Sequence, residues 1–283
     1  MSWLLCICLI CFGFGWEKAE ATETPPVYVI SDFVATLKST PQAIAETVTQ
    51  AQRLDPVVIL EDGKWCLVSL PRQHNYQGYI EKKSLIAWQA PAGKPYVAAV
   101  GVVSLYDKPG GVFVISVPLA APLTVVGEKD NYYIVATYQG NLYAYKKELR
   151  SIDNKPVLAK DIITSAKEYL GVSYLFGGVS PFGFDCSGFI WAVMASFGYY
   201  LPRDAGPQYY YEKFLNVEKN KLLPGDLVFF STYKTGPSHV GIYLGKNEFI
   251  NAAGSKGVSI ASLNNSYYKS RYLGARRMPF VKQ

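Results

Sequence analysis

The sequence predicts an α+β fold in which two small β-barrels precede a larger domain of mixed helices and strands. The first half repeats a pattern of short strands and turns, at residues 57–85 and 124–149. The second half contains a helix-like segment at 157–170 and an alternating strand at 238–244. With 283 residues, the chain is long enough for two or three modest domains.

We expect domain limits of 26–90 and 95–152 for the two barrels and 155–283 for the third domain. Residues 1–21 are expected to be a removable signal peptide, which would export the protein to the periplasm or the outside of the cell. This segment is apolar up to Gly15 except for Ser2, and the Ala-Glu-Ala at 19–21 fits a small-x-small cleavage site. Its start lacks Lys and Arg, so an uncleaved membrane anchor is the alternative.

The composition favours a globular protein with an anionic partner. Hydrophobic residues make up 49% of the chain and charged residues 18%, which excludes a disordered protein. Removal of residues 1–21 takes away one Lys and two Glu, so the net charge of +6 becomes +7. A mild positive excess suits an anionic polymer such as the cell wall. Nucleic acid is not expected as a partner, because no cluster of Arg and Lys with interleaved aromatic residues is present.

The two halves of the repeat align at an offset of 67 up to the end of the second strand and at 64 after it. The three-residue slip falls in a loop near residues 73–77, where a change of length costs little. Each unit therefore predicts a small barrel of short strands. The linker between them is expected at Pro91–Pro95, and Asp153–Pro156 closes the second unit.

Residues Val157–Leu170 are expected to form a helix, because apolar residues recur at helical spacing between Pro156 and Gly171. A second, buried helix is expected at 189–197, ending at Gly198.

Cys186 is the candidate nucleophile because it lies at the start of that buried helix. Free backbone N–H groups and the helix dipole stabilise a thiolate there, and the same groups can donate to an oxyanion. A free cysteine titrates near pH ~8.5, and such surroundings can lower its pKa by several units. Taken alone, the Asp-Cys-Ser-Gly at 185–188 favours an inert cysteine.

Cys66 is the second cysteine left after residue 21, and we expect both thiols to be free. Exported proteins often pair their cysteines, but this bridge would join two domains and consume Cys186. Cys66 lies in a strand-like run, where a small buried thiol is ordinary.

A thiol nucleophile needs a base, and the chain has two histidines. His74 lies in the loop of the first barrel and is expected to be solvated. His239 lies in an alternating strand, on the face opposite Val240 and Ile242. The base is therefore expected to be His239, and a histidine on an exposed sheet face is the alternative.

Asn251 is the candidate for orienting His239. A turn at 245–247 leads to a second strand at 248–252, so that positions 239 and 251 are expected opposite each other. Opposed side chains in such a hairpin lie about 4.5–5.5 Å apart at Cβ. An amide oxygen can fix the imidazole tautomer, although it stabilises an imidazolium less than a carboxylate would.

Six segments in this order resemble the NlpC family of cell-wall peptidases, whose fold is papain-like. They are Tyr174-Leu175-Phe176-Gly177-Gly178, Asp185-Cys186-Ser187-Gly188, Pro202-Arg203-Asp204-Ala205, residues 224–230, residues 238–243 and residues 249–252. The resemblance implies attack by Cys186, proton transfer by His239, orientation by Asn251 and help from Tyr174 in holding the oxyanion. The alternative to this catalytic role is that Tyr174 is a packed aromatic side chain. Asn251 replaces a commoner histidine, and Phe176 replaces a commoner tryptophan.

The two barrels resemble bacterial SH3-like domains. Together with the NlpC-like half, they make the chain similar to γ-D-glutamyl-L-diamino-acid peptidases that act on fragments with a free N-terminal L-alanine. That similarity implies that Asp204 binds the substrate ammonium and that Asp185 and Ser187 grip the D-glutamate. Glu46 and Tyr79 match positions that line the groove. A solvated Glu46 and a Tyr79 packed in the barrel core are equally open alternatives. Ala205 occupies a position where a hydroxyl residue is common in the similar peptidases.

Two kinds of role stay open for the barrels. They are either spacers that only fix orientation, or they bind the wall or complete the groove. We expect hydrolysis of the γ-D-glutamyl–diamino acid bond through a thioester, without metal or cofactor, since no Cys/His cluster is present. The expected partner is peptidoglycan or its peptide fragments. The alternatives are an endopeptidase or amidase acting on intact sacculus, acyl transfer, and a non-catalytic wall-binding protein.

Overall fold

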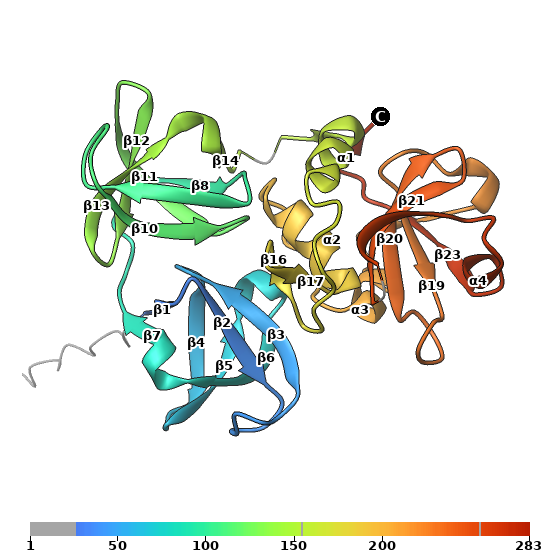
Figure 1. The fold of residues 1–283 in the computed structure, drawn as a ribbon, viewed down its shortest axis with the longest axis horizontal. Helices are drawn as coiled ribbons and strands as arrows, with labels where there is room; N and C mark the ends of the chain where they lie inside the picture. Colours follow the sequence, from blue (N-terminus) through green and yellow to red (C-terminus); the bar gives the residue numbers. More distant parts are fainter. Residues whose placement is uncertain (1–26, 154, 255) are drawn as a thin grey trace, which may run out of the picture.

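The computed structural model describes residues 27–153, 155–254 and 256–283. Three parts pack together, two of them built from strands and one from helices around a sheet (Figure 1). The fold is thus α+β, as expected. The predicted signal peptide lies outside the described residues. None of the helices within those ranges has the length and apolar character needed to cross a membrane.

The first part is one curled sheet of seven strands. Its spatial order is β3-β2-β6-β5-β4-β1-β7. The strands are Tyr28–Ile30 (β1), Val34–Lys38 (β2), Thr47–Gln52 (β3), Pro56–Glu61 (β4), Trp65–Leu70 (β5), Tyr76–Glu81 (β6) and Leu85–Ala87 (β7), with 3-10 turns at Pro71–Gln73 (η1) and Lys82–Ser84 (η2). Alternate side chains such as Leu37, Val68 and Ile80 fill its core, and Cys66 is buried among them as a free thiol.

The second part repeats this topology, in the order β10-β9-β13-β12-β11-β8-β14. Its strands are Lys94–Ala98 (β8), Val102–Tyr106 (β9), Phe113–Pro118 (β10), Pro122–Lys129 (β11), Tyr132–Thr137 (β12), Gly140–Tyr145 (β13) and Leu149–Ser151 (β14), with Lys146–Glu148 (η3) before the last. Residues 71–75 join β5 to β6, but only residues 138–139 join β12 to β13. The three-residue slip in the sequence alignment is this difference in loop length.

The third part has a six-stranded sheet in the order β18-β23-β19-β20-β21-β22, with α2 packed against β20 and β21. Its elements are Val157–Leu158 (β15), Ala159–Lys167 (α1), Val179–Ser180 (β16), Gly183–Phe184 (β17), Cys186–Ala195 (α2), Ala205–Tyr209 (α3), Leu215–Val217 (β18), Lys219–Lys221 (η4), Leu227–Phe230 (β19), His239–Gly245 (β20), Glu248–Ala253 (β21), Gly257–Ser262 (β22), Ser266–Lys269 (α4), Tyr272–Arg277 (β23) and Val281–Lys282 (β24).

The helix expected at 157–170 is shorter than predicted. Its first two residues instead form β15, which pairs in parallel with β24 near the end of the chain. This pairing is non-local, so helical periodicity alone could not anticipate it. The domain limits of 26–90, 95–152 and 155–283 stay a prediction.

Buried polar side chains of the first part hold all three parts together. The Gln52 amide donates to the carbonyl of Leu119 in the second part, at 2.6 Å, and to that of Val179 in the third, at 3.2 Å. Arg72 pairs with Asp55 and also donates to the Ala120 carbonyl. These contacts satisfy polar groups that would be costly to bury alone, so they fix the relative orientation of the parts.

The expectation of a solvated His74 is incomplete. Its ring is exposed, but Nε2 donates to the Tyr200 carbonyl at 2.9 Å. The loop that carries His74 therefore docks on the third part. The contact joins residues 126 positions apart, which a local sequence pattern does not reveal.

Candidate active site

Cys186 is the first residue of α2, and Asp185 caps that helix. One Asp185 oxygen, Oδ1, accepts from the Gly188 N–H at 2.7 Å, and Oδ2 accepts from the Gly177 N–H at 2.9 Å. Gly188 is needed here because a Cβ on it would lie 2.1 Å from the Gly178 carbonyl oxygen. The cap and the close approach fix the thiol at the start of a fully buried helix.

A buried ion pair supports the cap. The fully buried Arg203 donates to both Asp185 oxygens, at 3.0 and 2.5 Å. It also donates to Ser187 Oγ at 3.1 Å and to Thr49 Oγ1 of the first part at 2.8 Å. Asp185 and Ser187, which the resemblance assigned to substrate, are therefore also engaged in this internal network. Arg203 lies in one of the six family-like segments, but no role was predicted for it, because its burial depends on tertiary contacts.

The thiol is protonated in its resting state. Burial raises the pKa of Cys186 to about 12, and the nearby Asp185 carboxylate raises it further. Hydrogen bonds from the backbone at Val240 and Ser187 lower it by less. The expectation that the helix start would lower this pKa is wrong, because desolvation outweighs the N–H groups. The thiol Sγ lies 3.8 Å from the Ser238 carbonyl oxygen, and no hydrogen bond joins the described Cys186 and His239 side chains.

His239 is held by Asn251. The distance from His239 Nε2 to Asn251 Oδ1 is 2.8 Å, and Asn251 Nδ2 donates to the Ser259 carbonyl at 3.2 Å. Because the amide oxygen accepts, Nε2 carries the proton and Nδ1 keeps its lone pair. Burial lowers the pKa of His239, which the bond to Asn251 opposes only in part. The imidazole is therefore neutral and suited to act as a base.

The strand register differs from the expected one. Ile242 pairs with Ile250, so Asn251 stands opposite Gly241 and not opposite His239. His239 reaches Asn251 diagonally, across the space that Gly241 leaves open. A Cβ on Gly241 would lie 2.6 Å from Phe249 Cδ2 and 3.1 Å from Asn251 Cβ. The expected pairing is thus two residues out of register. The observed hairpin closes with Gly245 opposite Glu248, and a bulge between Tyr243 and Gly245 shifts the pairing by one residue.

Tyr268 is a site residue that the sequence analysis missed. Its ring stacks on His239 with a centroid distance of 5.9 Å and an interplanar angle of 26°. Its hydroxyl donates to Asn251 Oδ1 at 3.4 Å. The short helix α4 that carries it lies 17 residues beyond Asn251, and no motif marks it.

Two cavities meet at Cys186. The first, which we call the acidic pocket, has a volume of about 320 Å³. The second cavity, of about 920 Å³, also contains His239. Tyr174 lines both cavities, and burial raises the pKa of its hydroxyl, so that it is available as a donor.

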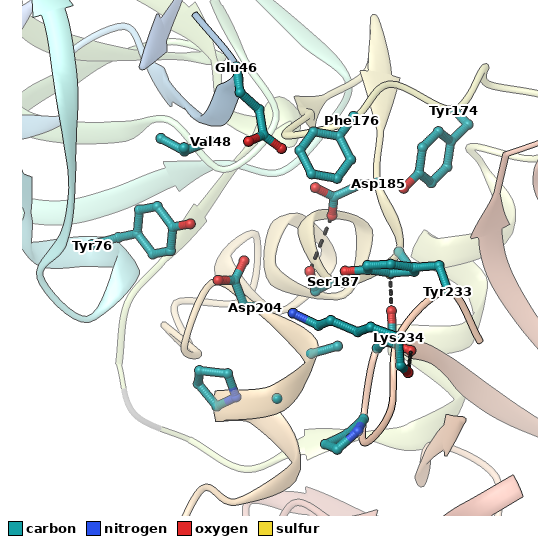
Figure 2. Close-up of a pocket in the computed structure, with 16 residues that line it drawn as sticks. Glu46, Val48, Tyr76, Tyr174, Phe176, Asp185, Ser187, Asp204, Tyr233 and Lys234 are labelled. Atoms are coloured by element: carbon teal, nitrogen blue, oxygen red, sulfur yellow. Dashed lines mark hydrogen bonds between the residues drawn. The ribbon is translucent and has the colours of Figure 1, made fainter. Parts of the chain in front are cut away.

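The acidic pocket lies between the first and third parts (Figure 2). The first part supplies Glu46, Val48 and Tyr76, and the third part supplies Asp204. Tyr79 does not line the pocket, contrary to the expectation. It lies three residues beyond Tyr76 in β6, and an odd spacing points two side chains to opposite faces of a strand.

Asp204 is the more buried of the two pocket carboxylates that Arg203 does not hydrogen-bond, and Arg203 Nη1 lies 4.0 Å from its Oδ1. Burial raises its pKa, while the nearby Arg203, Tyr76 and Lys234 lower it by less. Burial and Asp204 in turn raise the pKa of Tyr76 to about 12. Among residues 27–153, 155–254 and 256–283, no three His, Cys, Asp or Glu side chains come close enough to hold a metal ion.

The model of the NlpC/P60 family matches residues 171–277. A γ-D-glutamyl-L-lysine dipeptidyl-peptidase of Bacillus cereus is 32% identical over 239 residues, which cover 78% of this chain and 71% of that protein. The "Probable peptidoglycan endopeptidase LytE" of Bacillus subtilis is 50% identical over 119 residues, which cover 41% of this chain but only 33% of that protein. A crystal structure of an NlpC/P60 family protein from Bacillus cereus superposes with a TM-score of 0.76 at 25% identity, covering 89% of this chain and 99% of that one.

Proposed function

Because the chain belongs to the NlpC/P60 family, we propose that it is a cysteine peptidase acting on peptidoglycan stem peptides. The bond it hydrolyses joins γ-D-glutamate to the diamino acid, in peptides with a free N-terminal L-alanine. The observation that carries this proposal is the position of Cys186 between an acidic pocket and a second, larger cavity. The names of two relatives from Bacillus species, both γ-D-glutamyl-L-lysine dipeptidyl-peptidases, support the same bond.

The acidic pocket suits the L-Ala-γ-D-Glu part of the substrate. Its ammonium would lie between Glu46 and Asp204, since a partly buried cation needs a paired carboxylate. The γ-carbonyl would then reach Cys186, and the diamino acid would occupy the second cavity. Glu46 and Val48 limit the pocket on the side of the first part, so a peptide extended by glycan at its amino end fits poorly.

The chemistry follows from the protonation states of the resting site. Cys186 Sγ attacks the γ-carbonyl carbon while His239 Nδ1 takes the thiol proton, because a thiol with a raised pKa does not ionise first. The backbone N–H of Cys186 and the Tyr174 hydroxyl stabilise the oxyanion. The C–N bond then breaks, His239 returns its proton to the leaving amine, and a thioester remains. Water, deprotonated by His239, hydrolyses this thioester and releases L-Ala-γ-D-Glu.

We place the reaction outside the cytoplasm, with residues 1–21 as the export signal, because one relative, LytE, is named as a probable peptidoglycan endopeptidase. An endopeptidase acting on intact sacculus is the second candidate. The match to LytE favours it, but that match covers well under half of this chain.

The test is mass spectrometry of L-Ala-γ-D-Glu-meso-diaminopimelate incubated with the wild type and with Cys186→Ala. We expect L-Ala-γ-D-Glu from the wild type only, with a rate at least about 10⁴-fold lower in the variant. Cys66→Ala is the matched control, since it removes the other free buried thiol far from the site and should keep full activity. Digestion of purified sacculi without cleavage of this tripeptide would establish the second candidate instead.

A further inference from the structure

The acidic pocket contains one cation among the described residues that line it, and that cation is Lys234. Three carboxylates face it: Glu46, Asp185 and Asp204. Asp185 is already neutralised by Arg203, whose side chain is fully buried and does not line the pocket. Arg203 Nη1 also lies 4.0 Å from Asp204 Oδ1, but its hydrogen bonds to a carboxylate go to Asp185, so Glu46, Asp204 and the ammonium of Lys234 are the charged groups that face a ligand.

The backbone of Lys234 is anchored close to the nucleophile, while its side chain is exposed. It lies in the loop 231–238 between β19 and β20, and its carbonyl accepts from Ser231 Oγ and Ser238 Oγ, each at 3.1 Å. Ser238 precedes His239, and its own carbonyl is the one that faces Cys186 Sγ. Figure 2 shows the Lys234 side chain extended across the pocket toward Asp204. Lys234 is also close enough to Asp204 to lower the pKa of that carboxyl.

The proposed substrate brings one cation and one anion into this pocket. Its ammonium has Glu46 and Asp204 available. A γ-linked D-glutamate keeps its α-carboxylate free, and the two acidic side chains would repel that group unless a cation lay beside it. Asp185 and Ser187 cannot supply a positive charge, and the hydroxyl of Ser187 is already bonded to Asp185 and Arg203. A lysine suits the task, since its ammonium is a point charge on a long flexible stem.

We infer that Lys234 binds the α-carboxylate of the D-glutamyl residue and makes the enzyme select stem peptides with free D-glutamate over those with α-amidated D-glutamate. This inference rests on the proposed function. Amidation replaces the anion by a neutral carboxamide, which leaves Lys234 without its partner. The amidation state of the second stem-peptide residue would therefore determine which wall fragments the enzyme processes.

The test compares kcat/KM for L-Ala-γ-D-Glu-meso-diaminopimelate and for the same tripeptide with an α-carboxamide on D-glutamate. The wild type should prefer the carboxylate form by about 10- to 100-fold, as expected for a hydrogen bond between charged groups. Lys234→Met should lose this preference through a higher KM for the carboxylate form and leave the carboxamide form unchanged. Lys234→Arg should restore most of it. Lys160→Met, on the exposed face of α1, is the control and should behave as the wild type.

Two results would overturn the inference while leaving the proposed function intact. One is equal cleavage of both tripeptides by the wild type, and the other is an equal loss on both in Lys234→Met. Cleavage of neither tripeptide by the wild type would contradict the proposed function itself, and the inference with it.

Discussion

The two barrels have the same strand order but contribute differently to the active site. Glu46 immediately precedes β3 of the first barrel, and the matching position before β10 of the second is Val112. Tyr76 opens β6, and Gly140 opens the matching strand β13. The positions that give the first barrel a carboxylate and a phenol in the acidic pocket therefore carry neither group in the second.

The loop that differs between the barrels is also the one that docks the first barrel. The three extra residues between β5 and β6 bring Arg72 into the interface, where its carbonyl accepts from Trp191 Nε1 of the third part at 3.0 Å. Gln73 holds this loop to β3 of the same barrel, through Thr49 at 2.8 Å and the Gln50 carbonyl at 2.7 Å. The second barrel offers mainly backbone carbonyls, those of Leu119 and Ala120, to the same junction. The first barrel thus lines the acidic pocket, whereas the described residues of the second barrel are absent from its lining.

Among the substitutions that compare the two barrels, Arg72→Met is expected to have the largest effect, which is a loss of stability. It leaves Asp55 buried without its cation, which costs about 3–5 kcal/mol of unfolding free energy. Burial already raises the pKa of Asp55, so the variant should regain stability as the pH falls and this carboxyl takes up a proton. Urea denaturation followed by circular dichroism measures both effects.

Arg150→Met is the matched change in the second barrel. Arg150 meets the Ser196 carbonyl and the Phe197 ring, with no carboxylate partner among the described residues, so its loss should cost about 1 kcal/mol. Equal losses in the two variants would contradict the claim that the first barrel carries the buried charge network.

Glu46→Gln should raise the KM for the free tripeptide by about threefold to tenfold, because Glu46 is exposed and its attraction for the ammonium is screened by water. The kcat should change little, since Glu46 is remote from the reacting bond. Glu128→Gln, an exposed carboxylate of the second barrel, should leave both constants unchanged. A similar rise in KM for both variants would indicate a general charge effect.

Tyr76→Phe and Tyr79→Phe compare two tyrosines of one strand. The Tyr76 hydroxyl shares the acidic pocket with Asp204 and lowers the pKa of that carboxyl, so its loss should raise the KM by about twofold to fivefold. Tyr79 points to the other face of β6 and should be silent. A larger effect for Tyr79 would restore the original expectation for that residue.

The smallest effects are expected in the pH profile. As the pH falls, kcat should decline only below the 6.5 of a free imidazole, because burial lowers the pKa of His239. The KM should rise where Asp204 takes up a proton, above its ordinary pKa of 3.8. Tyr76→Phe removes a hydroxyl that lowers this pKa, so the rise in KM should begin at a higher pH. An unchanged KM profile in Tyr76→Phe would argue against this influence of Tyr76 on Asp204.

The local patterns were sufficient to predict the α+β class and the helix start that carries Cys186. They also placed His239 and Asn251 together in a hairpin, though two residues out of register, since Ile242 pairs with Ile250. The repeat offset of 67 and then 64 predicted a loop insertion near 73–77, and the structure has this loop at 71–75.

What the sequence did not reveal depends on tertiary contacts. Burial sets the pKa of Cys186, and burial is not visible in a helix-start motif. Tyr76 and Tyr79 differ by which face of β6 meets the third part, which depends on how the barrel docks. Arg203 lies in one of the six family-like segments, but its burial beneath the Asp185 cap depends on tertiary contacts, and Tyr268 lies in a segment outside those six.

The central claim is that the first barrel closes a pocket for a free ammonium. The most direct test is the ratio of kcat/KM for L-Ala-γ-D-Glu-meso-diaminopimelate to that for its N-acetylated form. The account predicts a preference of about 100-fold or more for the free amine, because acetylation leaves Glu46 and Asp204 without a cation and adds bulk at the closed end. Equal kcat/KM values for the two peptides would contradict it.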